Sequence, residues 1–200
     1  MLVSAIKAQV KNPNRVSIYI DGQYSFSLNP NQLLEQKLRV GLEITAEQLA
    51  DLQRASQFGK YLDRALNYAT IRPRSEKEFL DYARRKKWDP QEAQDILGRL
   101  VRGGYIDNRR FTRAWVENRQ LNKPVSRRRL VLELKQKGVP EQIISEVLSE
   151  RAFDEQESLR RLIDKKRKLT RYQDDDKLTR YLLTQGFRYE DVRKAMMADV

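Results

Sequence analysis

The stretch SRRRLVLELKQKGV, residues 126–139, decides the fold, because stretches of the same pattern occur before and after it. Its apolar residues are spaced by three and four, which is typical of an amphipathic helix. Equivalent positions recur roughly 50 residues apart, which indicates tandem repeats. The aligned sets are Phe79, Leu130 and Leu178; Ala83, Leu134 and Leu182; Trp88, Val139 and Phe187; Ala93, Ile144 and Val192; and Leu97, Leu148 and Met196.

The boundaries of the helices repeat as well. Ser75, Ser126 and Asp174 stand four residues before the first apolar position of their repeats, where an N-cap is expected. Gly138 and Gly186 stand where a left-handed residue ends a helix. A further periodic segment precedes each pair of helices, at residues 61–68, 111–119 and 159–168. Each unit is therefore expected to contain three short helices.

The predicted fold class is mainly α. We expect three tandem three-helix repeats, at residues 58–107, 108–153 and 154–200. Because each helix is near the minimum length for stability alone, the repeats must pack on one another, and we expect an elongated curved array.

Residues 1–57 predict a small N-terminal extension made of a β-hairpin and helices. Apolar residues alternate over residues 16–20 and 24–28, and Asp21-Gly22 lies between them, which is a strong hairpin signal. A third strand is expected near Val3, because an isolated hairpin is marginally stable. Thr45 and Gln48 form a predicted capping box at the start of a helix.

Composition excludes several kinds of chemistry. The chain contains no His and no Cys, so zinc fingers, Cys nucleophiles and His acid–base catalysis are impossible. No phosphate-binding glycine loop or paired-carboxylate motif occurs, and we expect no enzymatic activity, no cofactor and no metal. Three consecutive aspartates, residues 174–176, are interpreted as an N-cap cluster. No apolar run approaches the ~18 residues that span a bilayer, so we expect a cytoplasmic protein.

The net charge of +12 predicts an anionic partner. The charge is unevenly distributed: residues 108–153 hold 11 Lys and Arg against 5 Asp and Glu, which is half of the net excess. The middle repeat is therefore the most basic part of the chain.

Arg127, Arg128 and Arg129 occupy the first turn of a predicted helix. Cations there oppose the helix dipole, whereas the other two repeats place acidic residues in that turn, as the dipole favours. This departure from a local rule favours a functional site for phosphate, since helix N-termini attract anions. The alternative interpretation is a solvated basic face.

Six other arginines are candidates for the same surface. Arg109, Arg110, Arg113 and Arg119 surround Trp115, and predict a stripe that contacts phosphates, with Trp115 itself in the core. The alternative is that these arginines only cover the core. A second set, Arg72 and Arg74, flanks a proline in a loop between helices, where both could contact one anion or simply be solvated.

The central segment resembles the signature of the RecX family. It reads GGYIDNRRF at residues 103–111, followed by Ala114-Trp115 and Arg119. The segments RPRSEKE (72–78) and LKQKGV (134–139) resemble two further family motifs, and YIDG (19–22) is similar to the N-terminal extension of its longer members. Asn108 and Thr112 depart from the usual Asp and Ala, and the third repeat is the most divergent.

The resemblance implies a regulator of the RecA recombinase. Such a protein binds the RecA–single-stranded DNA filament, inhibits or destabilises it, and so modulates recombination, DNA repair and the SOS response. The implied partners are the RecA filament and single-stranded DNA, bound weakly and without sequence preference, with the chain as a monomer. The residues alone leave a second interpretation open, a helix-turn-helix-like, sequence-specific DNA-binding protein. Arg-rich helix starts favour phosphate contact over base readout.

Overall fold

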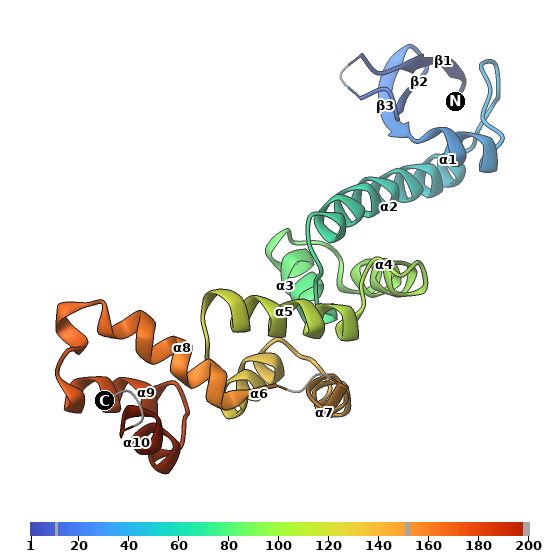
Figure 1. Ribbon diagram of the computed structural model, residues 1–200. Coiled ribbons are helices and arrows are strands. Elements are labelled where there is room, and N and C mark those ends of the chain that lie inside the picture. Colours follow the sequence, from blue (N-terminus) through green and yellow to red (C-terminus); the bar gives the residue numbers. More distant parts are fainter. Residues whose placement is uncertain (11, 151–152, 198–200) are drawn as a thin grey trace. The chain divides into compact units, whose positions relative to one another are not determined.

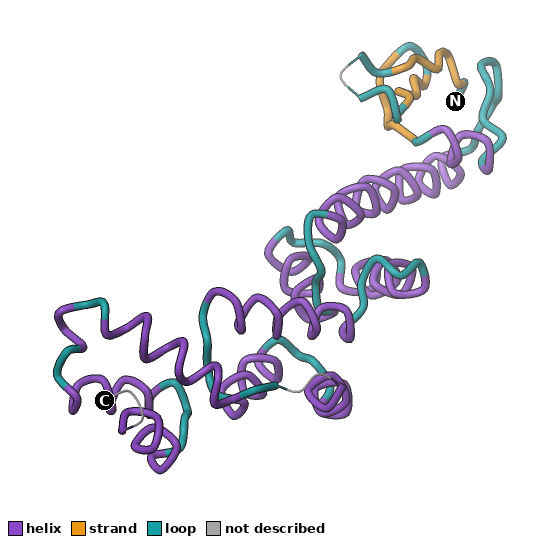
Figure 2. The backbone as a smooth tube through the Cα atoms, viewed as in Figure 1, coloured by secondary structure: helices purple, strands orange, loops and turns teal. Residues whose placement is uncertain are grey.

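The computed structural model describes residues 1–10, 12–150 and 153–197. The chain is mostly helical, and the strands in the described part all lie within the first 28 residues (Figures 1 and 2). Two compact units are formed, one by Met1–Tyr68 with Trp88–Ile96 and the other by Ala69–Lys87 with Leu97–Val200. The predicted fold class, mainly α with a small N-terminal β extension, is confirmed.

The first unit contains a three-stranded antiparallel sheet in the order β1-β2-β3. Its strands are β1 (Val3–Ala8), β2 (Val16–Ile20) and β3 (Gln23–Leu28). Asp21 and Gly22 both have positive φ, 48° and 83°, as a tight hairpin turn between β2 and β3 requires. The predicted hairpin and third strand are both present. The inner face of the sheet packs with later residues into one core made of Val3, Ile18, Ile20, Phe26, Leu28, Leu38, Ile44 and Leu52.

Two helices follow the sheet, α1 (Pro30–Glu35) and α2 (Ala46–Thr70). Thr45 and Gln48 form the predicted capping box: Thr45 Oγ1 accepts from the Gln48 N–H and Gln48 Oε1 accepts from the Thr45 N–H. Helix α2 runs without interruption past residue 57, the expected end of the N-terminal extension. The helix that begins after Thr45 and the periodic segment at residues 61–68 are therefore parts of one helix.

A buried arginine ties the sheet to α2. Arg15 is 5% exposed and donates to the Ser27 side chain and main-chain carbonyl. Its guanidinium also pairs with Asp63 of α2 over 2.7 Å. A buried charge needs such a full set of partners, so this contact anchors the sheet on the helix.

The remaining helices form the predicted repeats. Their bounds are α3 (Glu76–Arg85), α4 (Pro90–Arg102), α5 (Asn108–Asn122), α6 (Arg127–Gln136), α7 (Glu141–Glu150), α8 (Glu155–Arg167), α9 (Asp175–Thr184) and α10 (Tyr189–Met197), with one 3₁₀ turn, η1 (Thr170–Tyr172). Of the fifteen aligned apolar residues, all but the half-buried Met196 are buried. The repeat pattern is thus a pattern of core positions.

In the second unit, each of the last two repeats has a core of its own. The core of α5–α7 consists of Phe111, Val116, Val125, Leu130, Leu134, Val139, Ile144 and Leu148. The core of α8–α10 consists of Leu159, Leu162, Ile163, Leu178, Leu182, Phe187 and Val192. Truncating any of the central leucines to alanine is expected to cost about 2–5 kcal/mol of the free energy of unfolding.

The middle helices of successive repeats meet end to end. Ser75, the N-cap of α3, accepts from the Glu78 N–H and donates to the Lys137 carbonyl at the end of α6, over 2.7 Å. Ser126, the N-cap of α6, makes the same pair of bonds. The order α9, α6, α3 therefore places the carbonyl end of one helix against the N–H end of the next, which aligns their dipoles favourably.

The glycines that end α6 and α9 are required by these joints. Gly138 and Gly186 have φ of 74° and 88°, a conformation that glycine adopts without strain. A Cβ on Gly138 would lie 2.6 Å from the Lys77 Cβ, and one on Gly186 would lie 2.4 Å from the Ser126 Oγ. The equivalent residue after α3 is Lys87, which keeps a positive φ of 56° but carries a side chain.

Candidate interaction surface

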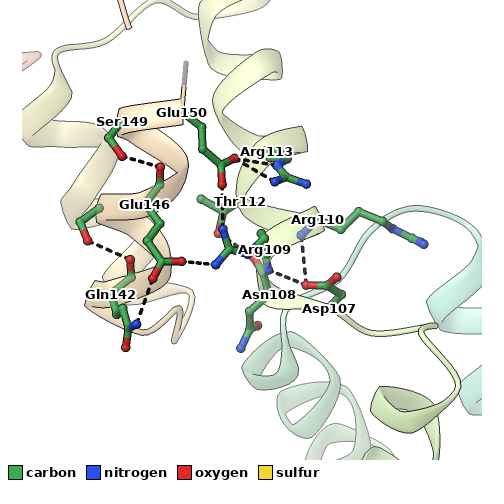
Figure 3. Close-up of polar contacts among 11 residues, drawn as sticks. Asp107, Asn108, Arg109, Arg110, Thr112, Arg113, Gln142, Glu146, Ser149 and Glu150 are labelled. Atoms are coloured by element: carbon green, nitrogen blue, oxygen red, sulfur yellow. Dashed lines mark hydrogen bonds and ion pairs between the residues drawn. The ribbon is translucent and has the colours of Figure 1, made fainter. Parts of the chain in front are cut away.

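Two of the predicted arginines hold α5 against α7 (Figure 3). Arg109 contacts both Glu146 and Glu150, the latter at 2.8 Å, and Arg113 pairs with Glu150 at 2.8 Å. The pKa of Glu150 lies below its usual range because Arg113 donates to it and both arginines attract its charge. The pKa of Glu146 is also lowered, first by the Gln142 amide and then by Arg109. This pair of arginines is therefore committed to contacts within the repeat.

Arg119 belongs to a second internal cluster. Its Nε pairs with the Glu133 carboxylate over 2.7 Å, and the Trp115 indole N–H donates to the same carboxylate over 3.1 Å. The Arg119 guanidinium and the Lys137 ammonium lie 4.9 Å and 5.2 Å from the centre of the Trp115 ring, as cation–π contacts. Trp115 packs on the core of α5–α7, as predicted.

Arg72 also has a partner inside the protein. It pairs with Glu78 over 3.0 Å, and Lys137 pairs with the same carboxylate over 2.9 Å. Burial is the largest influence on Glu78 and raises its pKa, but the bonds from Arg72 and Lys137 together outweigh it and lower the pKa overall. Arg74 is half-buried in the same loop.

Arg129 explains why a cation is tolerated in the first turn of α6. Its Nη1 donates to the Thr184 carbonyl at the end of α9, over 2.8 Å, so it lies between two helix ends. Lys77 does the same at the neighbouring joint, where its Nζ donates to the Gln136 carbonyl over 2.9 Å. The carbonyl end of α9 attracts the Arg129 cation and offsets its repulsion by the N-terminus of α6. The position of Arg129 therefore has a structural explanation.

Three predicted arginines remain uncommitted in the part of the chain that the structure describes. The side chains of Arg110, Arg127 and Arg128 are exposed and make no ion pair there. In Figure 3 the Arg110 side chain points away from the carboxylates that hold Arg109. These guanidinium groups are free to contact an anionic partner, so they form the candidate site.

Arg127 and Arg128 border a hollow of about 550 Å³ at the joint between α6 and α9. Its other lining residues are Val131, Leu132, Lys135, Glu155, Gly186, Phe187 and Arg188. The sequence patterns identified Gly186 as a helix end and Phe187 as a core position, but they did not indicate a hollow. The signal that would have revealed it is the apolar residue Leu132, on the exposed side of an otherwise regular helix. The hollow combines cations at its rim with an apolar floor.

The described residues hold no group of acidic side chains arranged to bind a metal ion. Their helices include none with the length and hydropathy to cross a bilayer. The helical repeats and the net charge of +12 define the class of the molecule, a basic helical-repeat protein.

Comparison with known proteins identifies a family within this class. Three family patterns match successive segments: the regulatory protein RecX N-terminal domain at residues 1–45, the RecX first three-helix domain at 62–100 and the RecX second three-helix domain at 107–148. The chain belongs to the RecX family of regulatory proteins.

Individual relatives agree with this assignment. Regulatory protein RecX of Listeria innocua is 32% identical over 154 residues, which cover 77% of this chain and 57% of the relative. RecX of Bacillus licheniformis is 28% identical over 199 residues, which cover 97% of this chain and 76% of the relative.

Two solved structures share the fold. A crystal structure of regulatory protein RecX superposes with a TM-score of 0.75 at 24% identity and covers 98% of both chains. RecX from Lactobacillus salivarius gives a TM-score of 0.58 at 22% identity and covers 72% of this chain and 97% of its own.

Proposed function

We propose that this protein regulates the RecA recombinase by binding the RecA–single-stranded DNA filament and inhibiting or destabilising it. It thereby modulates recombination, DNA repair and the SOS response, as a binding protein without chemistry or a cofactor of its own. The observation that carries the proposal is the match of three RecX domain patterns along one chain, because RecA regulation is the known role of that family.

The uncommitted arginines are the proposed direct contacts. Arg110, Arg127 and Arg128 belong to the most basic segment of the chain, and nothing among the described residues neutralises them. The other predicted arginines that have a partner within the protein contribute by holding the surface in shape; these are Arg72, Arg109, Arg113, Arg119 and Arg129. Arg74, in the loop before α3, is a further proposed contact.

The acidic starts of three helices disfavour the alternative of sequence-specific DNA binding. In a helix-turn-helix the last helix of the three-helix unit reads the bases with its first residues. The last helices of these repeats instead begin with carboxylates: Glu92 in α4, Glu141 in α7, and Glu190 with Asp191 in α10. Carboxylates there would repel the phosphates that flank a base pair, so we favour a filament-binding role.

Binding to the filament tests this proposal. This protein is titrated into labelled oligo(dT), either bare or coated with RecA in the presence of a non-hydrolysable ATP analogue. Binding is followed by fluorescence anisotropy over a range of salt concentrations. We expect weak, salt-dependent binding to oligo(dT) and tighter binding to the coated strand. Equal affinity for the bare and coated strands would contradict a filament-directed function.

A matched pair of variants places the contact. The double variant R127E/R128E removes the two arginines at the α6 joint, whereas R180E/R193E makes the same charge change at exposed positions of α9 and α10. We expect the first to lose filament binding and the second to retain most of it. Equal losses would show that only net charge matters.

A further inference from the structure

The hollow beside Arg127 and Arg128 is one half of a larger depression. A second hollow, of about 430 Å³, shares Arg128, Leu132 and Gly186 with the first. The residues that it adds to the lining are Arg129, Glu133, Gln136, Leu183 and Thr184. Leu132 is thus common to both, and its side chain is 53% exposed. Leu183 is 38% exposed. The depression therefore has an open aliphatic floor centred on one leucine.

The rim of this depression is strongly cationic. Arg127, Arg128 and Arg188 are exposed and have no carboxylate partner among the described residues. Lys135 also lines the first hollow, although it pairs with Glu141 over 2.9 Å. The only carboxylate of that lining is Glu155, which accepts from the Arg127 main-chain N–H over 3.2 Å. The second hollow adds the carboxylate of Glu133, which pairs with Arg119 and Arg129. Cations therefore outnumber carboxylates around the depression, which favours an anionic occupant.

The apolar floor of the depression distinguishes between two anionic occupants, a nucleic acid and an acidic peptide. Nucleic-acid bases bind by stacking on exposed aromatic faces. Phe187, the aromatic residue of the lining, is only 4% exposed and lies in the core of α8–α10. The exposed apolar atoms belong instead to Leu132 and Leu183, which gain nothing from a phosphate chain. An acidic peptide with one large apolar side chain satisfies both the rim and the floor, since apolar anchors seat in such hollows and rim charges steer them.

We propose that this depression binds an acidic peptide segment that inserts a large apolar side chain between Leu132 and Leu183. The inference rests on the proposed function in one respect, that the same two arginines contact the partner; it assigns to them the acidic residues of a protein rather than DNA phosphates. Contact with DNA then falls to cations outside the depression, Arg110 among them.

Direct binding of a synthetic peptide tests the inference without RecA. The probe is a fluorescein-labelled peptide of Asp, Glu and Gly with a single central leucine, and its comparison peptide carries Ser in place of that leucine. We expect the leucine peptide to bind the full chain roughly tenfold more tightly, which is the expected gain from burying one apolar side chain. Equal binding of the two peptides overturns the proposal.

Variants of the protein locate the peptide. L132S removes the floor, and L169S is its control because Leu169 is similarly exposed, at 49%, but outside the depression. We expect L132S to lose the roughly tenfold preference for leucine and L169S to keep it. R128A is expected to weaken both peptides. Unchanged helical circular dichroism in all three variants shows that they are folded.

Competition with oligo(dT) separates the two possible occupants. We expect excess oligo(dT) to leave most of the peptide bound at moderate salt. Complete displacement, together with oligo(dT) binding that L132S does not change and R128A abolishes, would assign the arginines to DNA and overturn the inference. If no peptide binds while the protein still inhibits RecA, this inference alone fails; if the peptide binds but RecA is unaffected, the proposed function alone fails.

Discussion

Ser126 Oγ donates a hydrogen bond to the Gln185 carbonyl over 2.9 Å and thereby joins the start of α6 to the end of α9. The Ser126 hydroxyl simultaneously accepts from the Arg129 N–H, so one buried side chain caps two helices. The same arrangement recurs at Ser75 and Lys137. Each serine thus satisfies two helix ends that would otherwise need separate caps. It contributes to the cohesion of neighbouring repeats together with Arg129 at one joint and Lys77 at the other.

Replacing Ser126 by alanine tests that contribution. S126A loses an N-cap and one of the two hydrogen bonds that the Gln185 carbonyl accepts, and it keeps the bond from the residue-126 main-chain N–H. We therefore expect it to lower the free energy of unfolding by about 1–2 kcal/mol. S145A is the control, because Ser145 is exposed in the middle of α7 and its hydroxyl donates to the Gln142 carbonyl of its own helix. Urea unfolding followed by circular dichroism measures both. Similar values for the two variants would contradict the role of the joint.

Gly186 and Gly104 distinguish a steric requirement from a conformational one. Both have positive φ, 88° and 71°, but a Cβ meets the Ser126 hydroxyl at Gly186 and nothing within 4 Å at Gly104. G104A is expected to cost about 1 kcal/mol, the strain of a left-handed alanine. G186A should cost clearly more in the same urea experiment, because the joint must also move apart. A smaller loss for G186A than for G104A would refute the close contact.

The pKa of Glu78 predicts a loss of stability in acid. Because the folded-state pKa lies below the usual value of 4.5, the ionised carboxylate stabilises the fold fully above that value. The contribution disappears as the pH falls through the lowered pKa. We expect E78Q to be less stable than the parent at pH 7, and the difference between them to shrink at low pH. A difference that does not vary with pH would rule out the pairing with Arg72 and Lys137.

Arg110 and Arg113 lie on the same helix but should respond differently to charge reversal. Arg113 faces Glu150, so R113E brings two carboxylates together and lowers the melting temperature. Arg110 has no partner of opposite charge among the described residues, so R110E should leave the melting temperature unchanged and weaken filament binding by roughly threefold to tenfold. Thermal unfolding and anisotropy separate the two effects. If R110E lowered the melting temperature and left filament binding unchanged, Arg110 would not belong to the interface.

Local sequence signals predicted the elements well. The spacing of Leu130, Leu134 and Val139 identified a core, because burial of one helix face imposes that period. The signals at Asp21-Gly22 and Thr45 were equally informative, since a hairpin turn and a capping box are each formed by neighbouring residues.

Long-range pairing could not be predicted in the same way. Arg109 meets Glu146 and Glu150 only because α5 packs on α7, and no local pattern records that packing. Arg129 was singled out because it opposes the dipole of its own helix, but the compensating carbonyl belongs to Thr184, in another repeat. The depression around Leu132 escaped detection for the same reason: residues from α6, α8 and α9 and from the loop after α9 form it.

The rate of ATP hydrolysis by RecA on single-stranded DNA tests the central claim most directly. Adding this protein is expected to suppress the rate in a dose-dependent manner, R127E/R128E should suppress it much less, and R180E/R193E should act like the parent. A hydrolysis rate that stays unchanged at saturating concentrations of the folded protein would contradict the account.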